Sequence, residues 1–117
     1  MLSLSISVQV YVCSRPADMR RSFDGLSVLV GQYVHEADLY GGHLFVFRNR
    51  RGDRLKVLYW DGDGLAIWYK RLEQGVFQLP SSPDDHVVVT PAQLAMILEG
   101  IDIRHLPRRR AWGRKRA

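Results

Sequence analysis

The sequence has little of the chemistry on which enzymes, metalloproteins and secreted domains depend. It contains one cysteine, Cys13, so it can build neither an internal disulfide framework nor a zinc site of paired cysteines. No glycine-rich phosphate loop occurs, and no apolar run reaches the length of a transmembrane helix. We therefore expect a protein without cofactor, metal or membrane segment, in a reducing cytoplasm. No two of the four histidines have the spacing of metal ligands; they are His35, His43, His86 and His105.

The carboxylates are arranged poorly for catalysis. Asp61 and Asp63 lie in an Asp-Gly-Asp-Gly stretch that begins like a calcium loop. Leu65 takes the next ligand position, however, and no closing glutamate follows at the required spacing. We interpret the stretch as a hairpin turn and expect no enzyme, with a metal-dependent nuclease using Asp61 and Asp63 as a third hypothesis.

Positive charge is concentrated at the C-terminal end. Residues 104–117 hold seven of the seventeen Lys and Arg residues and no acid, whereas residues 1–103 hold the other ten and all twelve acids. The end therefore carries +7 and the rest −2, which gives the net charge of +5. Such a run stays extended and gains by displacing counterions from a phosphate backbone, so nucleic acid is the first partner to test. The alternative is a tail that only aids solubility.

The N-terminal third predicts a strand and then a helix. Residues 1–12 alternate apolar and polar side chains, which is the pattern of a half-buried strand and not of an export signal. Asp18 is well placed to cap a helix, and apolar residues at steps of three and four predict its buried face. The residues of that face are Met19, Phe23, Leu26, Val30 and Val34.

The remainder predicts strands and one more helix. Strands are expected at residues 44–47, 55–60 and 65–69, joined by turns at 49–53 and 61–64, and further strands at 76–79 and 87–89. Thr90, Pro91 and Gln93 together start a helix that ends near Gly100. We expect one α+β domain over residues 1–103, with a mainly antiparallel meander sheet and two helices packed on one face. A flexible basic tail follows over residues 104–117.

The first hairpin turn carries five basic residues against one acid, Asp53. A hairpin projects its charges from a rigid base, as β-ribbon readers of DNA do. The even numbers of Arg48, Arg50, Arg54 and Lys56 suggest that several share one face. The alternative is edge protection, in which charges keep an exposed strand from pairing with other chains. The five residues are Arg48, Arg50, Arg51, Arg54 and Lys56.

Aromatic residues follow the same strands. Interleaved with Lys56, Lys70 and Arg71, they could stack on bases as in single-strand binders. Core packing is the interpretation that we favour for them, because a domain of this size needs large side chains and cross-strand aromatic pairs stabilise sheets. Trp112 differs, since it lies in the basic tail. The strand aromatics are Tyr59, Trp60, Trp68, Tyr69 and Phe77.

Five segments in order along the chain resemble one family. Between residues 10 and 110 the sequence resembles the small TnpB accessory protein of the insertion-sequence-66 family of bacterial mobile elements. Ser22 and Tyr59 depart from the family pattern, which has a glycine and a second tryptophan there. The resemblance implies a protein encoded beside a larger transposase and needed for efficient DNA transposition without supplying the cutting chemistry. The segments are PADMRRSFDGL (16–26), GHLFVFRNRR (42–51), DRLKVLYWD (53–61), YKRLE (69–73) and LAMILEGID (94–102).

These observations lead to one hypothesis and one alternative. The hypothesis is a non-catalytic accessory protein of a bacterial insertion sequence, nucleoid-associated, that binds the DNA of the element ends and assists the transposase of the same element. The alternative is a protein adaptor that docks on the transposase with no functional DNA contact; a homodimer stays open. The candidate DNA-binding residues are Arg48, Arg50, Arg51, Arg54, Lys56, Lys70, Arg71, Arg104, Arg108, Arg109, Arg110, Arg114, Lys115 and Arg116.

Overall fold

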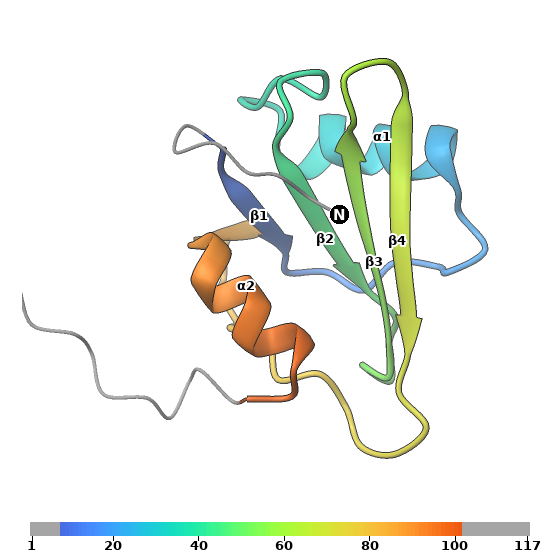
Figure 1. The fold of residues 1–117 in the computed structure, drawn as a ribbon, viewed down its shortest axis with the longest axis vertical. Helices are drawn as coiled ribbons and strands as arrows, with labels where there is room; N and C mark the ends of the chain where they lie inside the picture. Colours follow the sequence, from blue (N-terminus) through green and yellow to red (C-terminus); the bar gives the residue numbers. More distant parts are fainter. Residues whose placement is uncertain (1–7, 102–117) are drawn as a thin grey trace, which may run out of the picture.

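The structure is a computed structural model that describes residues 8–101 of the chain. These residues form a five-stranded sheet with two helices, which confirms the predicted α+β class (Figure 1). In chain order the elements are β1 (Val10–Cys13), α1 (Phe23–Tyr33), β2 (Leu44–Arg48), β3 (Arg54–Trp60), β4 (Leu65–Arg71), β5 (His86–Val89) and α2 (Pro91–Leu98). The predicted basic tail lies outside the described residues.

The sheet combines a local hairpin series with a strand inserted from the N-terminal part. Its order is β4-β3-β2-β1-β5. β2, β3 and β4 pair antiparallel, so the predicted meander is confirmed. β1 runs parallel to β2, with Val10 opposite Leu44, and antiparallel to β5, with Val10 opposite Val89. As a result β4 and β5 form the edges of the sheet, and β2 and β3 lie inside it.

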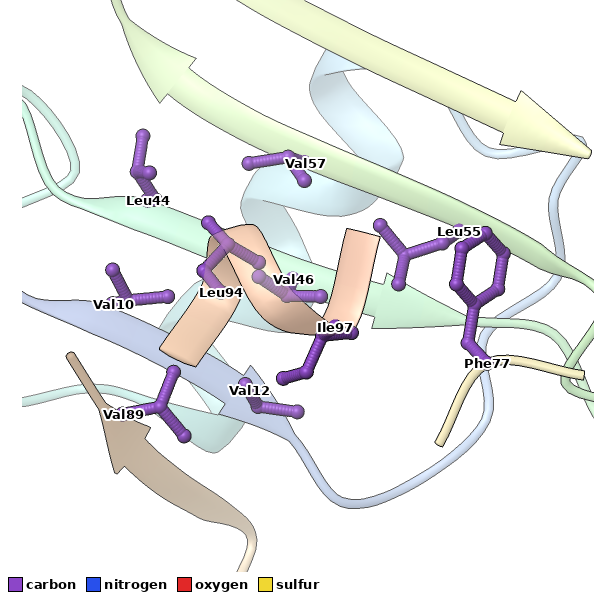
Figure 2. Packing of buried hydrophobic residues seen from close by; sticks show 10 residues of the cluster. All are labelled: Val10, Val12, Leu44, Val46, Leu55, Val57, Phe77, Val89, Leu94 and Ile97. Atoms are coloured by element: carbon purple, nitrogen blue, oxygen red, sulfur yellow. The ribbon is translucent and has the colours of Figure 1, made fainter. Parts of the chain in front are cut away.

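One face of the sheet is covered by α2. Figure 2 shows Leu94 and Ile97 of α2 above the alternate side chains of the central strands. Ile97 is fully buried, and Leu94 is 4% exposed. The strand residues of this core are Val10, Val12, Leu44, Val46, Leu55, Val57 and Val89.

The opposite face is covered by α1, so the expectation that both helices share one face is wrong. Leu26 and Val30 of α1 pack against Phe45 and Phe47, the side chains of β2 that point away from α2. A helix periodicity predicts an apolar stripe but not the sheet face that the stripe will meet. Since both faces are covered, β1 is buried at all four positions and not half-buried as expected. Residues 1–7 of the predicted first strand lie outside the described residues.

The first helix begins at Phe23, later than predicted, because Asp18 serves a turn and not a helix. The Asp18 Oδ1 atom accepts a hydrogen bond from the backbone N–H of Arg20 at 2.9 Å. An aspartate that bonds a backbone N–H two residues on forms an Asx turn, which competes with helix capping. Asp18 therefore shapes the loop that leads to α1, and the helix starts after Ser22.

The segment at residues 76–79 is not a strand, although β5 confirms the strand expected at 87–89. The backbone N–H of Phe77 donates to the carbonyl oxygen of Gly52 at 2.8 Å, which fixes the segment against the first hairpin turn. The Phe77 side chain is 5% exposed and belongs to the α2-side core. Its apolar character thus reflects burial of a loop residue.

The start of α2 has the predicted chemistry. The Thr90 side chain accepts from the backbone N–H of Gln93 at 3.0 Å, and the Gln93 side chain accepts from the backbone N–H of Thr90 at 2.9 Å. This capping box, with Pro91 in the first turn, confirms the sequence signal. At the other end Gly100 has a φ of +85° and its N–H donates to Ile97, as in a glycine-terminated helix.

Thr90→Ala is expected to lower the free energy of unfolding by about 1 kcal/mol, because it removes the acceptor for the Gln93 N–H. Urea denaturation of the full chain measures this. Thr90→Ser keeps the acceptor oxygen and is the control, which should retain most of the stability. Equal loss in both variants would contradict the capping role.

Candidate nucleic-acid interface

The turn between β2 and β3 is fixed by one asparagine. Asn49 Oδ1 accepts hydrogen bonds from the backbone N–H groups of Gly52 at 2.9 Å and Arg54 at 3.0 Å. Its Nδ2 donates to Asp53 Oδ1 at 2.7 Å. Gly52 has a φ of +81°, a conformation that glycine adopts without strain. These contacts hold the backbone from which Arg50 and Arg51 project.

A neighbouring loop holds the same turn from outside. The N–H of Leu72 donates to the carbonyl oxygen of Asp53, and the N–H of Phe77 donates to that of Gly52, both at 2.8 Å. Gly52 is buried as a result. The turn is therefore supported on two sides, as expected of a rigid base for charged side chains.

Arg48 and Lys56 are less exposed than Arg50 and Arg51. Arg48 is half-buried, and its Nη2 donates to the carbonyl oxygen of Ser14 at 3.0 Å. Lys56 is only 7% exposed, and its Nζ donates to the carbonyl oxygens of Met19 at 2.8 Å and Arg21 at 2.7 Å. Both side chains bind the protein's own backbone.

The expectation that several even-numbered basic residues share one face holds for Arg54 and Lys56 but not for Arg48. The register pairs Arg48 with Leu55 and Phe47 with Lys56, so even positions of β2 oppose odd positions of β3. Arg48 therefore lies on the α2 side, while Arg54 and Lys56 lie on the α1 side. The length of the turn sets this parity, as side chains alternate along each strand.

Lys70 and Arg71, the two candidates on β4, make different contacts. Lys70 Nζ donates to the carbonyl oxygen of Leu98 in the last turn of α2 at 3.3 Å, where a cation stabilises the negative end of a helix. Arg71 Nε lies 3.1 Å from Glu73 Oε2 in an exposed ion pair. The remaining candidates, Arg104, Arg108, Arg109, Arg110, Arg114, Lys115 and Arg116, lie outside the described residues.

Four arginines gather around a groove of about 580 Å³ between the β2–β3 turn and the loop before α1. We call it the arginine groove. Three of the four, Arg50, Arg51 and Arg54, are candidates from the sequence, and Arg20 joins them from the loop. The residues that line the groove are Pro16, Ala17, Asp18, Met19, Arg20, Asn49, Arg50, Arg51, Arg54 and Tyr69.

Lys56 explains why Arg20 lies at the groove. By binding the carbonyl oxygens on both sides of Arg20, its ammonium ties the loop to β3 across more than thirty residues of sequence. The Arg20 side chain stays 91% exposed. Sequence reasoning missed Arg20, and the Arg20-Arg21 pair was the only local signal for it.

The groove is electropositive. Its lining holds four arginines and one acid, Asp18, which leaves an excess of three positive charges. Asp18 pairs with Arg20, whose hydrogen bonds lower the pKa of that carboxyl to about 2, so Asp18 stays ionised at neutral pH. Arg50 makes no hydrogen bond or ion pair with any residue in the described range. Arg51 lies 4.0 Å from Asp53 with 84% of its side chain exposed, a contact that contributes little.

One aromatic side chain, Tyr69, lies at this groove. Its hydroxyl accepts a hydrogen bond from Arg54 Nη1 at 3.2 Å, and the residue is 45% exposed. Core packing, the interpretation favoured for the strand aromatics, is confirmed for Phe77, and Tyr59 packs against the same core. It is wrong for Tyr69, and Trp68 on the other side of β4 is also 38% exposed.

The hairpin aspartates lie in a turn, and the cysteine is buried. The Asp61 N–H donates to the carbonyl oxygen of Gly64 at 2.8 Å, which confirms the hairpin turn. Within residues 8–101 no three His, Cys, Asp or Glu side chains are grouped so as to hold a metal ion. Cys13 is 1% exposed, and burial, followed by the charge of Asp85, raises the pKa of its thiol to about 12. The thiol therefore stays protonated at neutral pH.

Comparison with known proteins identifies the family. A family model described as "IS66 Orf2 like protein" matches residues 8–108. The chain belongs to this family. Its membership confirms the resemblance carried by the five sequence segments, and it makes the chain an accessory protein associated with transposition of an insertion sequence.

Two proteins of Sinorhizobium fredii (strain NBRC 101917 / NGR234) are similar over nearly the whole chain. The uncharacterized protein y4jC is 37% identical over 109 residues, which cover 93% of this chain and 92% of y4jC. The uncharacterized protein y4hO is 41% identical over 105 residues, which cover 90% of each chain. No solved structure gives a significant match.

The IS66 Orf2-like match spans every residue that lines the arginine groove, since the lining extends from Pro16 to Tyr69. The groove therefore lies within the part of the chain that the family model matches. The described helices include none with the length and apolar character needed to cross a bilayer.

Proposed function

We propose that this IS66 Orf2-like protein is a non-catalytic DNA-binding factor that assists the transposase of its element, and that the arginine groove is its DNA contact. The observation that supports the proposal is the excess of three positive charges in a groove with a fixed backbone. Arginine guanidiniums bind phosphate oxygens through several N–H donors, which suits them to a DNA backbone.

Edge protection does not account for these charges. It applies to a strand whose outer backbone groups are open to another chain. β2 and β3 each pair with a strand on both sides, so the turn that joins them belongs to no sheet edge. The groove arginines consequently have no strand edge to shield, which favours a ligand.

The C-terminal basic run extends the proposed contact. Its seven basic residues follow α2 in sequence without any acid among residues 104–117. Arginine-rich segments of this kind reach along the backbone or into a neighbouring groove of DNA. In this proposal the groove and the tail together neutralise about six phosphates or more.

A salt titration tests the proposal. Binding of the full chain to a labelled duplex from an element end is measured by fluorescence anisotropy across a series of salt concentrations. With about six phosphates neutralised, log affinity should fall with log salt at a slope near −5. A scrambled duplex of equal length shows whether the contact is sequence-specific. A slope near zero for duplex and single-stranded DNA alike would refute DNA binding, and co-purification with transposase after nuclease treatment would then favour the adaptor.

A further inference from the structure

Tyr69 is held rigidly in the lining of the arginine groove. It stands opposite Lys56 in the β3–β4 register, and Lys56 Nζ lies 4.7 Å from the centre of its ring. Its hydroxyl is held by Arg54 Nη1 at 3.2 Å. A ring fixed at its face and at its hydroxyl loses little freedom when a ligand binds, yet 45% of the residue is exposed.

Lys56 and the groove arginines both adjoin Tyr69. Lys56 covers one face from the protein interior, where it is 7% exposed and does not line the groove. Tyr69 itself is one of the residues that line the groove. A half-exposed aromatic surface thus meets Arg50, Arg51 and Arg54 in one hollow.

The chemistry of this hollow has two components that fit different parts of one ligand. An aromatic ring stacks on the flat face of a nucleic-acid base, and guanidiniums bind its phosphate. Arg54 donates one of its five N–H groups to Tyr69, so four stay available for phosphate. The volume of about 580 Å³ lies within the range of pockets that enclose small molecules.

A paired base cannot use the ring in this way. In a duplex each base face is covered by its neighbours in the stack, and only the base edges and the phosphates reach the surface. An unpaired nucleotide has a free face. The combination of ring and arginines therefore discriminates between the two forms of DNA, whereas arginines alone would not.

We propose that the arginine groove binds an unpaired nucleotide of single-stranded DNA, with the base stacked on Tyr69 and the phosphate held by Arg50, Arg51 and Arg54. This inference rests on the proposed DNA-binding function and adds a preference of the groove for unpaired over duplex DNA, whose phosphates the same arginines also contact. Lys56, whose ammonium contacts no carboxylate among residues 8–101, adds its charge beneath the ring.

The test compares variants of the full chain on two probes. One probe is a labelled oligothymidylate of about twelve nucleotides, within the site sizes of single-strand binders, and the other is a hairpin duplex with the same number of phosphates. Tyr69→Leu is expected to weaken oligothymidylate binding by about fivefold to a hundredfold, as loss of one stacked base does. Duplex affinity should change less than about twofold, since its phosphate contacts stay in place.

The matched control is Trp68→Leu. Trp68 is similarly exposed at 38%, lies next to Tyr69 on β4 and points to the opposite face of the sheet. It should leave both affinities unchanged, and Tyr69→Phe, which keeps the ring, should retain most of the single-strand affinity. Thermal unfolding of each variant verifies that the fold is intact.

The salt dependence separates stacking from charge. Tyr69→Leu should leave the slope on oligothymidylate unchanged, because stacking releases no counterions, whereas Arg54→Gln should make it less negative by about 0.7. If Tyr69→Leu weakens binding equally on both probes, or on neither, the inference is overturned. The proposed function still stands in that case, provided that the wild type binds the duplex. Absence of binding to both probes by the wild type overturns both.

Discussion

Arg50, Arg51 and Arg54 changed together to glutamine should lower duplex affinity by about two to three orders of magnitude at 0.1 M salt. Each phosphate contact contributes about 0.9 to the slope of log affinity against log salt, so three lost contacts make that slope less negative by about 2.7. Because 0.1 M is one log unit below 1 M, this change in slope corresponds to a loss of about 2.7 in log affinity at 0.1 M relative to 1 M. Anisotropy titrations of wild type and variant at several salt concentrations measure both quantities.

The control removes arginine charge from outside the groove. Arg15 and Arg21 are exposed, do not line the groove and are not among the candidate DNA-binding residues. Changing these two to glutamine should alter the slope by less than about one, because neither side chain lies in the groove proposed to hold the phosphates. If the control loses as much affinity as the groove variant, binding is a property of net charge and the groove is not the contact.

Local chemistry made much of the fold predictable. The meander of β2, β3 and β4 follows from short turns with glycine, and α2 follows from its capping box. The position of β1 was not predictable in this way. It pairs with β2 and with β5, so Val10 meets Leu44 and Val89, partners that no local periodicity specifies. Burial of β1 on both faces depends on that central place and on a helix covering each side.

The candidate site was predictable only as a concentration of charge. Sequence located Arg50, Arg51 and Arg54 on the β2–β3 turn, because a run of basic residues is visible without a fold. It could not separate them from Lys56, since the face of each strand residue depends on the register. Nor could it place Arg20 at the groove, because the contacts that hold its loop span 35 and 37 residues.

Lys56→Met should lower the free energy of unfolding by about 2–3 kcal/mol. The Nζ atom makes two short hydrogen bonds to backbone carbonyls, and bonds from a charged donor are worth about 1.5–3 kcal/mol each. Part of this gain is offset by the cost of burying an ammonium group, since Lys56 is only 7% exposed. The expected loss is therefore less than the sum of the two hydrogen bonds. Urea denaturation should show a lower midpoint with an unchanged slope, as for a loss of stability alone.

Lys70→Met provides the matched control for this prediction. Lys70 lies on the neighbouring strand, is half-buried, and makes one longer bond of 3.3 Å to the carbonyl oxygen of Leu98. Its replacement should cost about 1 kcal/mol or less. Because Lys56 also holds the loop that carries Arg20, Lys56→Met should weaken DNA binding in addition, whereas Lys70→Met should not. Equal stability of the two variants would show that the buried ammonium does not anchor the loop, and the groove would then need another explanation for its shape.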